Sequence, residues 1–229
     1  MSYPLVIKDN FFRDADSIFE FCNKLDLIDN PSYANYPGDR ASCLSNTNKK
    51  LYLFISQKIF HILHDKLPSH YRMDIEFQKI YPFVKDDKWD RKNRGWVHTD
   101  KCLFGGVIYL DKNPDKDAGT GIYESKYGYD VQTDESVFYK ELLHSGKLMD
   151  DGQYYEAYDM ISDQYKETLR VPNVYNRLLL IPGDQFHAMT TIGDRERNTI
   201  VFFCYEAMGV LPPEYKKETC TNSNDELKF

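Results

Sequence analysis

From residue 74 onward the sequence is a succession of short apolar segments, separated by loops that contain Gly, Pro and Asp. Segments of this length and pattern predict β-strands. We expect strands near Ile75–Tyr81, Phe104–Leu110, Gly121–Tyr123, Arg177–Ile181, Phe186–Thr190 and Thr199–Tyr205. So many short strands in one chain indicate a mainly β fold, a sandwich or jelly roll.

The part of the chain before these strands predicts helices instead. Residues 13–28 read as helical, and residues 49–67 carry an apolar stripe at helical spacing that ends before Pro68. Residues 3–8 predict a short strand, and residues 30–48 predict a loop because they are rich in Asn, Pro, Ser and Gly. We therefore expect helices packed on the outside of the jelly roll.

The chain as a whole, residues 1–229, predicts a single domain with one long insertion. The expected parts are an N-terminal helical part (1–73), a jelly-roll core (74–123 and 177–210), the insertion (124–176) and a polar tail (211–229). Within the insertion, Leu142–Leu148 and Tyr154–Leu169 are candidate helices.

The insertion also has an unusual composition. It holds 11 acidic and 5 basic residues and eight of the 18 tyrosines, so it carries most of the net charge of −7. Long insertions between core strands usually serve as functional lids or are disordered. We expect a mobile lid that selects a cationic or hydrogen-bonding substrate, because a wall of one sign attracts the opposite charge. The alternative is a surface loop that only covers a sheet.

Overall composition excludes several classes of protein. The pI of about 5.4 argues against a nucleic-acid-binding protein, which normally shows a basic face. The five cysteines are scattered without a CxxC pair, which is not a disulfide framework or a zinc site. No signal peptide and no apolar run of membrane-spanning length is evident in the sequence. We therefore expect a cytoplasmic protein with no membrane partner.

One histidine of the six has an aspartate two residues later: His98, followed by Asp100. On a strand these two positions face the same side and can share a cavity. His187 is the candidate for a third ligand, because it opens a strand after a Pro-Gly-Asp turn. Two histidines and one carboxylate with open coordination positions form the facial triad of non-haem Fe(II) oxygenases. By itself an HxD motif is a weak signal.

An arginine ten positions after His187 strengthens this interpretation. Arg197 begins an apolar strand and shares a face with Thr199, so we expect its side chain to point into the fold. A buried guanidinium can hold the distal carboxylate of a dicarboxylate cosubstrate through two parallel hydrogen bonds. Arg195 has the same parity and is the second candidate, and a position of Arg197 in solvent at the strand edge is the alternative.

These residues resemble the prolyl 4-hydroxylase-like branch of the 2-oxoglutarate/Fe(II)-dependent dioxygenase superfamily. The resemblance covers roughly residues 77–205 without the insertion. It implies a double-stranded β-helix, Fe(II) held by His98, Asp100 and His187, and 2-oxoglutarate and O₂ as cosubstrates. It also implies that Arg197 and Tyr109, in the run Tyr109-Leu110-Asp111, bind 2-oxoglutarate, while Tyr81 lines the pocket.

The resemblance implies a hydroxylase that acts on a protein side chain, a peptide or a small molecule. Two other classes stay open at this point. A cupin-like metal enzyme without 2-oxoglutarate would have no use for Arg197 and Tyr109. A non-catalytic jelly-roll binding module would have no reason to place two histidines and an aspartate at this spacing.

Overall fold

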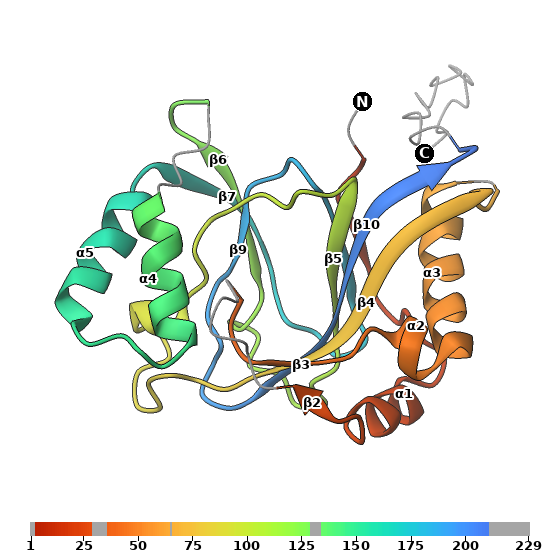
Figure 1. Cartoon of the computed structure of the whole chain (residues 1–229), viewed down its shortest axis with the longest axis horizontal. Helices are drawn as coiled ribbons and strands as arrows, with labels where there is room; N and C mark the ends of the chain where they lie inside the picture. Colours follow the sequence, from red (N-terminus) through yellow and green to blue (C-terminus); the bar gives the residue numbers. More distant parts are fainter. Residues whose placement is uncertain (1–2, 29–35, 65, 129–133, 211–229) are drawn as a thin grey trace, which may run out of the picture.

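The structure of the protein is a computed structural model that describes residues 3–28, 36–64, 66–128 and 134–210. Within these residues the chain forms a large and a small antiparallel sheet, with helices packed at two places (Figure 1). The mainly β jelly roll expected from the strand pattern is confirmed.

The large sheet has seven strands in the order β1-β8-β5-β10-β4-β3-β2, and the small sheet has three in the order β7-β6-β9. The strands are β1 (Val6–Lys8), β2 (Leu27–Ile28), β3 (Asp39–Ala41), β4 (His70–Ile80), β5 (Phe104–Tyr109), β6 (Thr120–Ser125), β7 (Tyr165–Val171), β8 (Leu178–Pro182), β9 (His187–Met189) and β10 (Arg197–Met208). The helices are α1 (Ala15–Cys22), α2 (Leu44–Thr47), α3 (Lys49–Leu63), α4 (Asp134–His144), α5 (Asp151–Ser162) and the 3₁₀-helix η1 (Arg91–Asn93). None of the described helices has the length and hydropathy needed to span a membrane.

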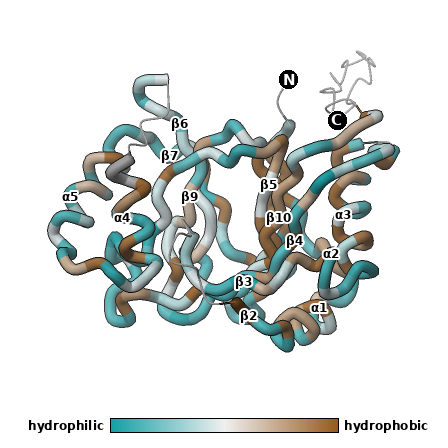
Figure 2. Tube along the Cα trace, in the orientation of Figure 1, coloured by the Kyte–Doolittle hydropathy of each residue, from teal (hydrophilic) through white to brown (hydrophobic). Residues whose placement is uncertain are grey.

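Helices α1–α3 cover the outer face of the large sheet. The apolar stripe of α3, with Ile55 and Ile59 fully buried, packs against Ile75 and Phe77 of β4 and Phe202 of β10. Figure 2 shows the hydrophobic segments of these strands and of α3 side by side. Because strand residues alternate between faces, the residues between these point to the other face of the sheet, into the jelly roll.

The inner faces of the two sheets meet in a second apolar cluster. Tyr109, Leu179 and Ile181 of the large sheet pack there against Ile122 and Val171 of the small sheet. This packing sets the spacing of the two sheets and leaves the polar inner residues near β9 and the start of β10 to form a site.

The N-terminal part is less helical than expected. The helix predicted over residues 13–28 ends at Cys22, and Leu27–Ile28 is strand β2 instead. The predicted loop over 30–48 contains β3 and α2, apart from residues that lie outside the described part of the chain. Strands this short exist only through pairing: β3 pairs with β4 and β2 with β3, and the contact with β4 is a long-range one that local sequence does not encode. Helix α3 ends at Leu63, since His64 adopts an extended conformation.

The insertion is also built differently from the prediction. Helix α5 ends at Ser162, so the helix predicted over Tyr154–Leu169 is wrong over residues 163–169. The chain turns there into β7, which pairs with β6 as an edge of the small sheet. The insertion therefore supplies part of the jelly roll, and its two helices lie beyond the small sheet (Figure 1).

Candidate metal and cosubstrate site

Backbone hydrogen bonds bring the three predicted metal ligands together. His187 is the first residue of β9, and it exchanges both backbone hydrogen bonds with His98, N to O distances 2.9 and 3.0 Å. The backbone N–H of Asp100 donates to the carbonyl of Gly183 at 2.9 Å. Gly183 approaches the opposite backbone so closely that a Cβ atom there would lie 1.8 Å from the carbonyl oxygen of Cys102. The Pro-Gly-Asp turn is thus shaped to support the HxD segment.

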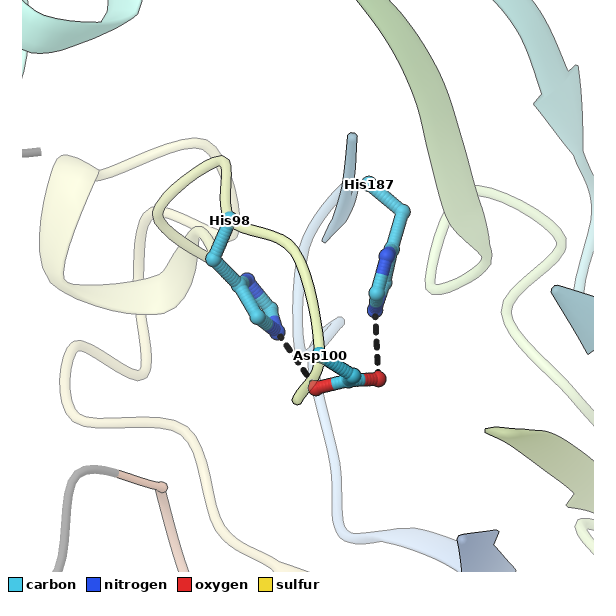
Figure 3. Close-up of side chains that lie close together, drawn as sticks. All are labelled: His98, Asp100 and His187. Carbon is cyan, nitrogen blue, oxygen red and sulfur yellow. Dashed lines mark ion pairs between the residues drawn. The ribbon is translucent and has the colours of Figure 1, made fainter. Parts of the chain in front are cut away.

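The three side chains converge on one point (Figure 3). One ligand atom from each of His98, Asp100 and His187 lies within 4.8 Å of the other two. Asp100 presents one carboxylate oxygen 3.8 Å from Nε2 of His98 and the other 3.4 Å from Nε2 of His187. Among the described residues this is the group with the composition and spacing of a metal site.

The other nitrogen of each imidazole is held by the backbone. Nδ1 of His98 lies 2.8 Å from the carbonyl oxygen of Trp96, and Nδ1 of His187 lies 2.9 Å from that of Gln185. A carbonyl only accepts, so both Nδ1 atoms carry the proton and both Nε2 atoms present a lone pair to the site. Metal-binding imidazoles are oriented by such a hydrogen bond.

Charge in the site favours a neutral imidazole at His98 and an ionised carboxylate at Asp100. Burial, together with the neighbouring charges of His187 and Lys140, lowers the pKa of His98 to about 4, although Asp100 opposes the shift. Burial opposes ionisation of Asp100, but the hydrogen bond and charge of His187 bring its pKa below the ordinary value. For His187 burial lowers the pKa, but Asp100 outweighs it and the pKa is raised.

Two neutral imidazoles and one carboxylate on one side of a point are the donors that suit Fe(II) with open positions for other ligands. These residues suit Fe(II) because of their chemical type, and also because the backbone already holds both imidazoles in the tautomer that a metal requires. His98, Asp100 and His187 are therefore the residues that would hold the metal.

A buried cation lies at the start of β10. Arg197 is 4% exposed and has no ion-pair partner in the described part of the chain, which is unusual for a buried charge. Its Nε donates to the carbonyl of Ala118 at 3.1 Å, and its guanidinium carbon lies 5.4 Å from the centre of the Tyr109 ring. The predicted inward orientation of Arg197 thus agrees with its position, whereas Arg195 is exposed and pairs with Asp194.

Hydroxyl groups surround this cation. The hydroxyls of Tyr109 and Thr120 lie 2.8 Å apart, and Oγ1 of Thr199 is buried without a partner among the described residues. On β6, Thr120 lies two residues from Ile122, the residue opposite His187, so the hydroxyl group faces the same interior as the triad. Arg197 and these hydroxyls can hold a carboxylate close to the metal site.

Sequence reasoning missed Thr120 in this role. A threonine in a short strand is ordinary, and only the pairing of β6 with β9 places it beside the triad. Tyr81 directly follows β4 and is 49% exposed, at the end of the sheet where Ile80 pairs with Arg197. Its role as a pocket-lining residue stays a prediction.

Helix α5 supports the HxD segment from outside. Trp96 is 4% exposed and packs edge-on against Tyr154 and Tyr158, with ring centroids 5.6 and 5.3 Å apart. Arg91 forms a two-pronged ion pair with Asp159, at 2.7 to 3.1 Å. These contacts favour a fixed wall for the insertion over a freely moving lid.

Comparison with solved structures agrees with this fold. HygX from Streptomyces hygroscopicus with nickel and 2-oxoglutarate bound shares 9% identity, with a TM-score of 0.55 over 93% of this chain and 85% of that chain. HygX with iron bound shares 8% identity, with a TM-score of 0.52 over the same shares. The non-haem α-ketoglutarate-dependent epimerase SnoN from nogalamycin biosynthesis shares 10%, with a TM-score of 0.53 over 89% and 78%.

The protein thus has the double-stranded β-helix fold of the 2-oxoglutarate/Fe(II) oxygenases, and the resemblance predicted from the sequence is confirmed as a shared fold. Residues 1–198 match the family described as "Family of unknown function (DUF6445)", and the chain belongs to this family. No curated protein matches the sequence.

Proposed function

We propose that this protein is an Fe(II)- and 2-oxoglutarate-dependent oxygenase that hydroxylates a C–H bond of a small molecule or of a protein side chain. The observation that carries the proposal is the pair of backbone-anchored imidazoles. Both place Nε2 next to the carboxylate of Asp100, with the buried, unpaired Arg197 in the same interior.

In this proposal the residues divide the work between metal and cosubstrate. His98, Asp100 and His187 hold Fe(II), which supplies the activation of O₂ coupled to oxidative decarboxylation of 2-oxoglutarate. Arg197 receives the distal carboxylate of the cosubstrate, because a buried guanidinium without a carboxylate partner is stabilised by gaining one. Tyr109 carries a pKa raised by its burial, so it stays protonated and can donate a hydrogen bond.

The site also restricts water. Tyr109, Thr120 and Thr199 are buried, so a cosubstrate carboxylate would accept their hydrogen bonds in a region of low dielectric. The apolar cluster formed by Ile122, Leu179 and neighbouring side chains closes this end of the jelly roll. A cosubstrate held here is oriented before any primary substrate arrives.

The test is oxygen consumption and succinate formation by purified protein supplied with Fe(II), ascorbate and 2-oxoglutarate. We expect slow, uncoupled succinate formation in the wild type and none above background in Asp100→Ala. Iron binding with no dependence of O₂ consumption on 2-oxoglutarate would favour the cupin-like metal enzyme. Absence of specific iron binding would favour the binding module.

A further inference from the structure

Arg40 is a second cation inside the jelly roll, and the proposed metal and cosubstrate site does not use it. It lies on β3, which pairs with β4 on one side and with β2 on the other. Just before β3, Gly38 has a φ of +72° and comes so close to β4 that a Cβ atom would lie 2.2 Å from the carbonyl oxygen of Lys79. Only glycine tolerates both the conformation and the contact. Gly38 therefore allows the close approach of this segment to β4, and this approach fixes the position of Arg40.

The guanidinium of Arg40 reaches across the inner face of the sheet. Its Nη1 pairs with Glu76 of β4 at 3.2 Å, and its guanidinium carbon lies 5.7 Å from the ring centre of Phe203 of β10. The ring of Tyr36 covers one of its faces at 3.7 Å. Arg40 is thus held flat between aromatic rings, in the fork geometry suited to planar anions.

Phe203 connects Arg40 to the triad. A Cβ atom added at Gly105 would lie 3.1 Å from the Phe203 ring and 3.5 Å from a carboxylate oxygen of Asp100, so ring and carboxylate border the same spot. The charge of Asp100 is also felt by Arg40: burial lowers the pKa of Arg40, while Glu76 and Asp100 oppose this. The guanidinium therefore lies on the side of the candidate metal site where Asp100 and Phe203 meet.

One edge of this guanidinium has no partner. Nη1 is taken by Glu76, but Nε is buried without a hydrogen-bond partner among the described residues, and no described residue bonds Nη2. A buried N–H without an acceptor is destabilising. If Arg40 only tied β3 to β4, the ion pair with Glu76 would suffice, and Nε would not need to be withdrawn from water.

We propose that the free edge of Arg40 binds a carboxylate of the primary substrate, so that the substrate is a carboxylate-bearing molecule held on the opposite side of the triad from 2-oxoglutarate. This inference rests on the proposed function. A planar carboxylate matches the Nε and Nη2 pair in a two-pronged contact. A monoanion fits better than a phosphate dianion, because Glu76 already places one negative charge beside the guanidinium.

The proposed substrate carries a negative charge, whereas the composition of the insertion predicted a cationic or hydrogen-bonding substrate. The insertion is acidic overall, yet its Lys140 is 7% exposed and its charge acts on His98. Arg40 and Lys140 are thus cations that act on the triad from outside the cosubstrate site, whereas Asp151 and Asp159 of α5 pair with Lys92 and Arg91.

The test uses fluoroacetate as a probe and fluoroacetamide as its neutral match, both followed by ¹⁹F NMR line broadening. The protein is loaded with Zn(II) and saturating 2-oxoglutarate, so the cosubstrate site is occupied. We expect fluoroacetate to broaden several-fold more than fluoroacetamide in the wild type. The difference in broadening between the two probes should vanish in Arg40→Gln. It should shrink in Arg40→Lys, which keeps the positive charge but loses the two-pronged geometry of the guanidinium.

Arg72→Gln is the matched control, because Arg72 also pairs with a glutamate, Glu206 at 3.3 Å, and lies 4.5 Å from a tyrosine ring, but its side chain is 58% exposed. It should behave as the wild type. Equal broadening by the two probes in the wild type, or broadening by fluoroacetate that persists in Arg40→Gln, would overturn the proposal. Thermal melting shows that each variant is folded, and Arg40→Lys serves if Arg40→Gln is not.

Competition identifies the source of the carboxylate. Displacement of fluoroacetate by free L-alanine indicates the α-carboxylate of an amino acid, and displacement by acetyl-Ala-Asp-Ala-amide indicates an acidic side chain. Displacement by neither overturns the assigned substrate class.

Failure of the proposed function is visible separately, because Fe(II) and 2-oxoglutarate then give no charge-transfer band in any variant. Loss of that band in Arg40→Gln alone would assign Arg40 to the cosubstrate and also overturn the proposal.

Discussion

The indole N–H of Trp96 donates a hydrogen bond to the hydroxyl of Tyr154 at 2.9 Å, which links the HxD segment to helix α5. The carbonyl of the same Trp96 orients the imidazole of His98. The insertion is therefore part of the support of the candidate metal site.

Tyr154→Ala should destabilise the protein by about 3–5 kcal/mol, the usual range for removal of a large, fully buried aromatic side chain. The measurement is urea unfolding followed by circular dichroism. Met160→Ala, on the same helix but 49% exposed, is the control and should change stability by less than about 1 kcal/mol. Equal, small effects of both substitutions would show that α5 is a dispensable lid.

Gly183→Ala should weaken metal binding about 10- to 100-fold, the usual range when the support of a metal ligand is lost. The added methyl group has no room beside the backbone of Cys102, and the segment that carries Asp100 must move. Fe(II) or Zn(II) titration measures the effect. Gly152→Ala, an exposed helix position where the nearest atom belongs to the side chain of Asp150, is the control. Unchanged affinity in Gly183→Ala would mean that the turn does not set the position of Asp100.

Arg197→Met should raise the KM for 2-oxoglutarate by at least about ten- to a hundredfold, since loss of a buried charged contact costs about 2–5 kcal/mol. Arg195→Met should have little effect, because this exposed arginine pairs with its neighbour Asp194. Succinate formation as a function of 2-oxoglutarate concentration gives both values. A larger effect of Arg195→Met would place the cosubstrate outside the jelly roll.

Tyr109→Phe should raise the same KM by about three- to tenfold, as expected for one hydrogen bond of about 1 kcal/mol. The ring packing is kept, so stability should change little. Tyr81→Phe should have the smaller effect, because the Tyr81 side chain is half exposed. The reverse order would exchange the roles predicted for these two tyrosines.

Much of the jelly roll could be predicted because its core strands are short apolar runs bounded by turn residues. β5, β8 and β10 were all expected within a few residues of their bounds. The end of α5 could not be predicted, because no glycine or proline marks the turn after Ser162. β7 forms there only through its pairing with β6.

The candidate site also contains residues that could be predicted from the sequence and residues that could not. HxD, the distal histidine and Arg197 follow one another at recognisable spacing, so they could be proposed from sequence. Thr120 and Arg40 could not, because each lies on a short strand whose place depends on pairing with a strand far away in the chain. From the sequence, Lys140 is one residue of an insertion that is acidic overall. Only its burial shows that its side chain faces inward.

The central claim is that His98, Asp100 and His187 hold Fe(II) with 2-oxoglutarate beside it, and anaerobic absorption spectroscopy tests it most directly. Wild-type protein with Fe(II) should develop a weak visible charge-transfer band only when 2-oxoglutarate is added. His98→Ala, Asp100→Ala and His187→Ala should each lack the band while keeping the wild-type circular dichroism spectrum, because none of the three side chains belongs to the apolar clusters. A full band in any one of these variants, or no band in the wild type, would contradict the account.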